Sequence, residues 1–157
     1  MIKLTTIISI VCVAICSNLA FSSELTVNIK KVEVLDKVIM MELFLLAEAE
    51  STDWMQAQLI DKKRILLGTE NQQGIAEFTF SNIENGRYAL RVFQDLNDNG
   101  FLDRSSSDIP VEPIGFSNNP SLFGGEPTPE DSVINVTQDT IISINLKHKK
   151  PRKKRNK

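Results

Sequence analysis

The sequence has little of the chemistry on which many catalytic and metal sites depend. Among its 157 residues are two cysteines, Cys12 and Cys16, and one histidine, His148. Both cysteines lie in an apolar segment near the N-terminus, and the histidine lies in a basic segment near the C-terminus. Ser-His-Asp and Cys-His catalysis each need such a residue inside the folded domain, so the sequence argues against both. The same scarcity disfavours transition metals, which prefer imidazole and thiolate ligands.

Positive charge is scarce in the body of the chain and concentrated at its end. The full chain carries a formal net charge of -2, from 18 Lys and Arg against 20 Asp and Glu. All 20 acidic residues but only nine basic ones lie in residues 23–146, whereas residues 147–157 hold eight basic residues and none that is acidic. We therefore expect an acidic domain at 23–146 and a basic, disordered tail at 147–157.

The first 22 residues have the pattern of an export signal. Lys3 precedes an apolar run, residues 4–16, that is as long as a signal-peptide core and too short for a comfortable membrane span. Ala20 and Ser22 place small residues at the two positions that a signal peptidase reads, so we expect cleavage after Ser22. The mature chain would then lack cysteine and a transmembrane segment, and it would be periplasmic or secreted.

Hydrophobic periodicity predicts an all-β fold, because apolar residues recur at strand spacing and almost nowhere at helical spacing. The expected strands cover residues 25–29, 38–46, 64–68, 76–80, 87–93, 133–136 and 141–146. One helical turn is expected within residues 47–60, capped by Thr52 or Asp53, with Trp54 covering one end of the core. The pattern predicts a single antiparallel β-sandwich over residues 23–146 with one long ordered loop.

Three local features refine this prediction. Residues 38–46 (VIMMELFLL) are interrupted only by Glu42 and predict a central strand, although a run of this length would also fit a buried helix. Asn85 and Gly86 form the strongest hairpin signal in the chain. Residues 94–130 form an irregular stretch, and a loop of that length in a small domain is usually functional or ordered by a metal.

The segment from Asp95 to Asp103 (DLNDNGFLD) has the ligand spacing of a calcium-binding loop. Oxygen-bearing side chains occupy its first, third, fifth and ninth positions, glycine occupies the sixth, and the seventh would offer a backbone carbonyl. The four oxygen-bearing side chains are those of Asp95, Asn97, Asn99 and Asp103. The sixth residue is Gly100 and the seventh is Phe101. Calcium takes six to eight oxygen ligands in irregular geometry, so we expect calcium or another hard cation here. An Asx-rich turn without metal is the alternative.

The loop departs from that pattern at its twelfth position, where a bidentate glutamate is expected and Ser106 is found. No helix is predicted on either side, so the loop is not an EF-hand. The replacement ligand would be Asp108, Glu112 or water, and we favour Glu112. The predicted metal site therefore comprises Asp95, Asn97, Asn99, Phe101, Asp103 and Glu112.

A set of spaced residues resembles a known family. The set is Gly86, Tyr88 and Ala89, then the Asp95–Asp103 loop with Leu102, then Pro110, Glu112, Gly115, Phe116, Ser117, Asn118 and Asn119. The chain resembles the exported bacterial family called domain of unknown function two-one-four-one. This resemblance implies a secreted or periplasmic bacterial protein with a transthyretin-like or immunoglobulin-like β-sandwich, and it implies no activity. The chain departs from the family at Asp108 and Ile109, where a glycine is usual, and in its basic tail.

We expect an exported, non-catalytic, calcium-stabilised domain that binds an unknown protein or carbohydrate. The alternatives are a purely structural envelope protein and, least favoured, a glycoside hydrolase that uses the clustered carboxylates. Phe101, Phe116 and Phe123 bear on this choice, because solvent-facing rings favour binding and buried rings favour a structural role. An exported chain would not meet nucleic acid, and its basic tail would make at most weak contact with an anionic envelope surface.

Overall fold

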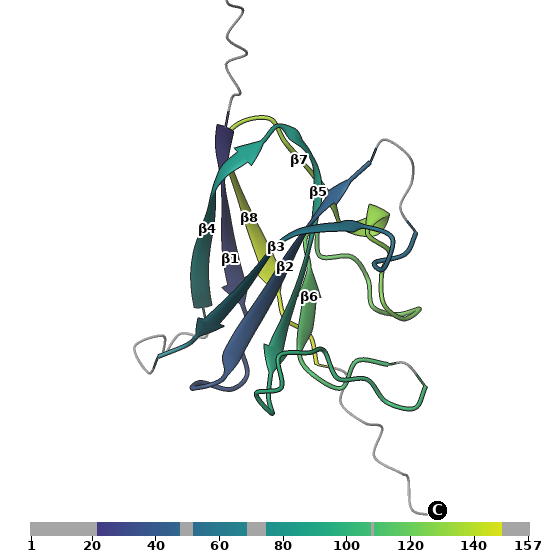
Figure 1. Cartoon of the computed structure of the whole chain (residues 1–157). Helices are drawn as coiled ribbons and strands as arrows, with labels where there is room; N and C mark the ends of the chain where they lie inside the picture. The colour runs from purple at the N-terminus through teal and green to yellow at the C-terminus, as the bar shows by residue number, and fades with distance from the viewer. Residues whose placement is uncertain (1–21, 48–51, 69–74, 108, 149–157) are drawn as a thin grey trace, which may run out of the picture.

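The structure is a computed structural model, and it describes residues 22–47, 52–68, 75–107 and 109–148. Two β-sheets pack face to face, which confirms the predicted β-sandwich (Figure 1). The strands are β1 (Ser22–Lys30), β2 (Val38–Leu46), β3 (Gln58–Leu66), β4 (Ile75–Glu84), β5 (Gly86–Asp95), β6 (Ile114–Phe116), β7 (Val133–Val136) and β8 (Thr140–Asn145). One sheet has the order β4-β1-β8, and the other has the order β3-β2-β5-β6, with β7 also pairing with β5.

The main core lies between the two sheets and follows from the alternation in the strands. On β1, Leu25, Val27 and Ile29 are fully buried, while the residues between them face outward. They meet the inward residues of β2 and β5, among them Ile39, Met41, Leu43, Leu90 and Val92. Burying alternate apolar side chains on both inner faces is what holds a sandwich of this size together, because the described residues contain no cysteine that could form a disulfide.

A second core covers the outer face of the larger sheet. Its buried residues are Val38, Met40, Phe44, Leu46, Trp54, Ala89, Phe93, Ile114 and Phe116, with Leu102, Leu122 and Val133 packed against them. Leu102 and Leu122 come from the long stretch after β5, so this stretch is a covering layer. Because β2 is apolar toward both cores, its continuous hydrophobic run forms a strand between β3 and β5, and the buried-helix alternative is wrong.

Within the covering layer, β6 lies very close to β8 and to the residues that follow it. A Cβ atom added to Gly115 would lie 2.7 Å from Ile144 Cγ2 and 2.9 Å from the Asn145 carbonyl oxygen, so only glycine fits here. Ile114 and Lys147 exchange two backbone hydrogen bonds, of 2.8 and 3.0 Å. Lys147 therefore contacts the domain, and Nε2 of His148 lies 3.0 Å from the Val111 carbonyl oxygen. Residues 1–21 and 149–157, which include most of the expected signal peptide and tail, lie outside the described residues.

The hairpin predicted at Asn85 and Gly86 is wrong. β4 pairs with β1, whereas β5 lies in the other sheet, so the chain crosses between the sheets at this point. A two-residue type I′ turn needs positive φ at both central residues, and neither Asn85 nor Gly86 has one. The sequence also did not predict that β8 pairs in parallel with β1. All other strand pairs in the two sheets are antiparallel among the described residues.

The segment before β3 contains the single turn expected from the sequence. The Asp53 carbonyl accepts hydrogen bonds from Gln56 and Ala57, and the Asp53 carboxylate accepts one from the Met55 amide. Trp54 is buried in the second core and donates from Nε1 to the Pro127 carbonyl over 2.7 Å. In the part of the chain that the structure describes, no helix is long and apolar enough to cross a membrane.

Candidate functional site: the Asp95–Asp103 loop and the cleft beside it

The predicted cation loop begins at the last residue of β5 and is fixed to the strands around it. Asp95 is fully buried and pairs in the sheet with Val38 of β2. Lys37, which precedes β2, forms a 2.8 Å ion pair with Asp98 of the loop. Lys62 of β3 donates to the Gly100 carbonyl over 3.2 Å. The loop therefore starts at the end of β5, a strand inside the larger sheet, and two lysines from outside the loop contact it.

The side chains at the odd positions of the loop turn toward one another. The Asp95 carboxylate accepts hydrogen bonds from the amides of Asn99 (3.1 Å) and Gly100 (2.7 Å). The Asp103 carboxylate accepts from Nδ2 of Asn97 (2.6 Å) and from Nδ2 of Asn99 (3.1 and 3.2 Å to its two oxygens). Gly100 has a φ of 79°, as the sharp turn at the sixth position requires. Four of the six predicted ligand residues thus converge.

Glu112 closes the loop from the segment before β6. Its two carboxylate oxygens accept hydrogen bonds from the backbone amides of Leu96 (2.8 Å) and Asp103 (3.1 Å), which lie at opposite ends of the loop. The Val111 amide donates in turn to the Asp103 carbonyl over 3.0 Å. Glu112 is buried and lies beside the loop. Asp108, the alternative ligand, lies outside the described residues.

Burial raises the pKa of Glu112 above its ordinary value of 4.5, and the nearby charges of Asp103 and Asp95 raise it further, against the lowering effect of its two amide hydrogen bonds. The Glu112 carboxyl therefore has a higher pKa in the folded than in the unfolded state. Its contribution to the free energy of unfolding is present below the unfolded pKa and is lost as the pH rises through the folded pKa. We expect carbon-detected NMR of the calcium-free protein to give Glu112 a pKa above 4.5, and added calcium to lower that pKa. A calcium-free value below 4.5 would contradict the electrostatic picture of the loop.

The loop offers mixed oxygen ligands. Among the described residues, no group of three or more His, Cys, Asp and Glu side chains is placed to hold a metal ion. The loop instead combines the carboxylates of Asp95 and Asp103 with the amides of Asn97 and Asn99. Calcium accepts amide and backbone oxygens as well as carboxylates, whereas zinc does so rarely, so this donor set suits a hard cation.

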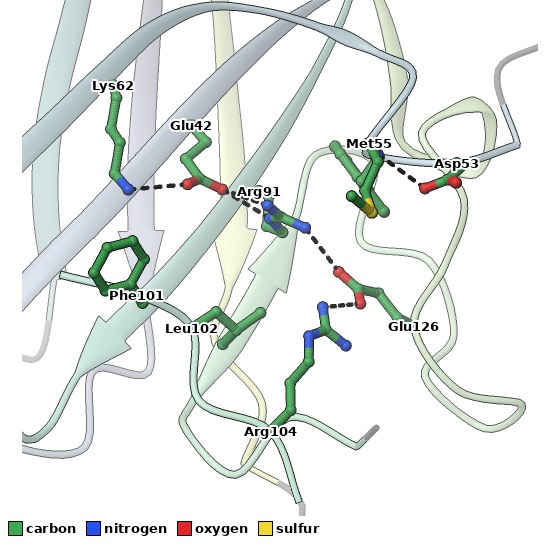
Figure 2. A pocket seen from close by; sticks show the side chains of 10 residues that line it. Glu42, Asp53, Met55, Lys62, Arg91, Phe101, Leu102, Arg104 and Glu126 are labelled. Atoms are coloured by element: carbon green, nitrogen blue, oxygen red, sulfur yellow. Dashed lines mark hydrogen bonds and ion pairs between the residues drawn. The ribbon is translucent and has the colours of Figure 1, made fainter. Parts of the chain in front are cut away.

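A cleft beside the loop, which the sequence prediction missed, contains a row of alternating charges. Its floor is a cross-strand triplet in which Glu42 of β2 lies between Lys62 of β3 and Arg91 of β5. Glu42 bonds Lys62 over 3.2 Å and Arg91 over 2.7 and 2.8 Å. Arg91 also pairs with Glu126 over 3.3 Å, and Glu126 pairs with Arg104 (Figure 2). We call this the ion-row cleft.

The ion-row cleft has a volume of about 400 Å³ and is lined by Glu42, Asp53, Trp54, Met55, Lys62, Arg91, Phe101, Leu102, Arg104 and Glu126. Phe101 and Leu102 belong to the Asp95–Asp103 loop and Arg104 follows it, so this loop forms one wall of the cleft (Figure 2). The guanidinium of Arg91 lies 5.5 Å from the centre of the Phe44 ring and 5.2 Å from that of Trp54. These contacts fix the middle of the row against the second core.

The three phenylalanines of the long stretch have different surroundings. Phe116 is 2% exposed and packs against Trp54, with 5.5 Å between the ring centres. Phe101 is 70% exposed in the wall of the cleft, and the Lys62 amino group lies 5.7 Å from the centre of its ring. Phe123 is 97% exposed and does not line the cleft. Two of the three rings therefore face solvent, and one has a packing role.

The fold defines the class of structure: a two-sheet β-sandwich whose long stretch after β5 covers one sheet. The chain belongs to the bacterial family described as "Uncharacterized protein conserved in bacteria (DUF2141)", whose model matches residues 27–143. This match confirms the resemblance seen in the sequence. Comparisons with curated proteins and with solved structures gave no match.

Proposed function

We propose that this chain is an exported, non-catalytic binding module whose Asp95–Asp103 loop is stabilised by calcium. The observation that carries the proposal is the convergence of Asp95, Asn97, Asn99 and Asp103, with Glu112 closing the loop from outside it. In an ion-bound loop, the two asparagines would turn their amide oxygens inward, and the ion would take the place of the amide donors on Asp103. Water would complete the six to eight ligands.

The binding role is favoured over a purely structural one by the surface next to the loop. Phe101 exposes most of its ring in the wall of a cleft of about 400 Å³, whose lining also includes Trp54 and Leu102 of the second core. An exposed aromatic ring beside fixed polar groups is typical of a ligand site. The candidate ligands are a protein or a carbohydrate.

Catalysis is the least favoured alternative. The clustered carboxylates accept hydrogen bonds within the loop or form ion pairs in the cleft, as Asp95 and Glu126 illustrate. A glycoside hydrolase needs one carboxyl group held as an acid and another as a nucleophile or base across a substrate cleft. In the cleft, Glu42 and Glu126 are both paired with Arg91, so the same guanidinium engages both carboxylates and they do not face each other across an open substrate site.

The calcium proposal is tested by thermal unfolding of the mature domain with calcium and with a chelator. The few charges of the loop predict a dissociation constant on the order of 10⁻⁴ to 10⁻³ M. At a hundredfold excess over that constant, calcium would raise the free energy of unfolding by about 2.7 kcal/mol. Calorimetry should show the corresponding rise in melting temperature. Equal melting temperatures in calcium and chelator would reduce the loop to an Asx-rich turn.

Export is tested separately, by mass spectrometry of the protein from its bacterial host. We expect a mature chain that starts near Ser23, in the periplasm or the medium. Ser23 is already part of β1, where it pairs with Ile83, so nearly all of that strand would survive the cleavage. Intact Met1 on the mature protein would rule out the signal peptide.

A further inference from the structure

We propose that the ion-row cleft binds a neutral saccharide, a ligand assignment that rests on the proposed role as a binding module. The cleft is built from three parts of the chain that are distant in sequence: the outer face of the larger sheet, the turn at Asp53–Met55 and the stretch after β5. Its volume of about 400 Å³ falls within the range of roughly 300–1,000 Å³ that is usual for small-ligand sites.

The charges of the cleft favour a neutral ligand. Three cations and three carboxylates line it, so its lining has no net charge: Lys62, Arg91, Arg104, Glu42, Asp53 and Glu126. Within the row, each charge faces an opposite charge at ion-pair distance. A charged ligand would have to compete with these pairs and would leave one partner desolvated, which is costly. A neutral ligand leaves the pairs in place.

The alternation of the row favours hydroxyl groups in particular. Along Lys62, Glu42, Arg91, Glu126 and Arg104, hydrogen-bond donors alternate with acceptors. A hydroxyl both donates and accepts, so neighbouring hydroxyls on one ligand can bond to a carboxylate and to the adjacent cation. Bonds to ionised groups are stronger than bonds between neutral ones. The contacts of Arg91 with Phe44 and Trp54 hold the row in a fixed position for such a ligand.

Apolar side chains flank the row, and they distinguish a saccharide from a simple polyol. Phe101 lies near the Lys62 side of the row, and Met55, which is 93% exposed, lies near its other side (Figure 2). A sugar ring has hydroxyls around its edge and C–H groups on its faces. Those faces carry slight positive charge and stack on the negative face of an aromatic ring, while the edge hydroxyls reach the polar row. Short linear oligosaccharides meet both requirements at once.

The experiment uses Trp54, the single tryptophan of the chain, as an internal reporter. Trp54 lines the cleft, so a ligand bound there will change its emission. The mature domain, in saturating calcium, is titrated with maltotriose, cellotriose and N,N′,N″-triacetylchitotriose, and the binding heat is measured by calorimetry. Trigalacturonate and trialanine serve as an acidic saccharide and a peptide. We expect saturable binding of at least one neutral trisaccharide, at millimolar or lower concentration.

A pair of phenylalanine variants then locates the site. Phe101→Ala removes the ring in the wall and should weaken binding of the neutral trisaccharide by about threefold to tenfold, the range expected for one aromatic contact. Phe123→Ala removes a second exposed ring, which lies outside the cleft, and should leave binding unchanged. Equal effects of the two variants would overturn the assignment of the site, and the unfolding curve of each variant verifies that it is folded.

The result also separates this inference from the calcium proposal. No response to any neutral trisaccharide, or binding of only trigalacturonate or trialanine, would overturn the saccharide assignment. The melting temperature with calcium and with chelator, measured on the same samples, tests the calcium proposal independently of saccharide binding. Phe123→Ala, which changes a residue outside both the loop and the cleft, should retain the calcium response of the original chain.

Discussion

Asp95→Asn should remove most of the calcium-dependent rise in melting temperature, whereas Asp98→Asn should preserve it. Both changes remove one negative charge from the same loop, so they alter its general attraction for cations alike. Asp95 is fully buried and turned into the loop, where it binds the amides of Asn99 and Gly100. Asp98 is turned outward to Lys37. Only Asp95 would therefore touch an ion held by the odd positions.

Asparagine is the appropriate replacement at both positions. Asp98 has a φ of 63°, a conformation that asparagine tolerates better than alanine, so the control carries little backbone cost. At a hundredfold calcium excess, the original chain should gain about 2.7 kcal/mol and Asp98→Asn nearly the same, while Asp95→Asn should gain little. Calorimetry with calcium and with chelator measures each difference within one variant. If both variants lose the response equally, the ligand spacing proposed for the loop is wrong even though an ion binds.

Phe116→Ala should destabilise the domain by about 3–5 kcal/mol, the cost of emptying a well-packed aromatic position. Phe116 is 2% exposed and lies in the second core, in ring contact with Trp54. A loss this large is expected only if the stretch after β5 packs as a permanent layer on the outer face of the sheet. The prediction therefore tests the feature that creates both the loop and the cleft.

Phe123→Ala is the matched control for Phe116→Ala. It removes the same side chain from the same stretch, but from a position that is 97% exposed, and it should change the free energy of unfolding by less than about 0.5 kcal/mol. Urea unfolding measures both variants. A cost below about 1 kcal/mol for Phe116→Ala would mean that the covering layer opens without disturbing the sandwich. That result would contradict the packing of this layer in the second core.

The sequence predicted those elements whose signal is local. β2 was found with its bounds because both of its faces are buried, which makes the run of apolar residues continuous. β3 begins earlier than expected, at Gln58, because it is an exposed edge strand with charged residues, and such a strand lacks an apolar alternation. Asn85 and Gly86 did mark a break between two strands, but no local signal shows that these strands belong to different sheets.

The same distinction separates the loop from the cleft. The loop could be predicted because its ligand spacing lies within nine consecutive residues, from Asp95 to Asp103. The cleft could not, because the Glu42–Arg91 contact joins residues 49 positions apart and depends on the register of β2 against β5. Glu42, the one charged residue in the apolar run of β2, was the single hint that a polar feature crosses the sheet.

The place of β1 in its sheet determines when the domain can fold. The first strand lies in the middle, between β4 and the last strand, β8, and the Glu24 amide bonds the Asp139 carboxylate across 115 positions of sequence. Contacts between such distant residues slow folding, because the chain must close a long loop before it gains them. Until β8 has been synthesised, β1 has an open edge and the main core lacks Ile144. The sandwich can therefore be completed only after β8 has been synthesised and has paired with β1.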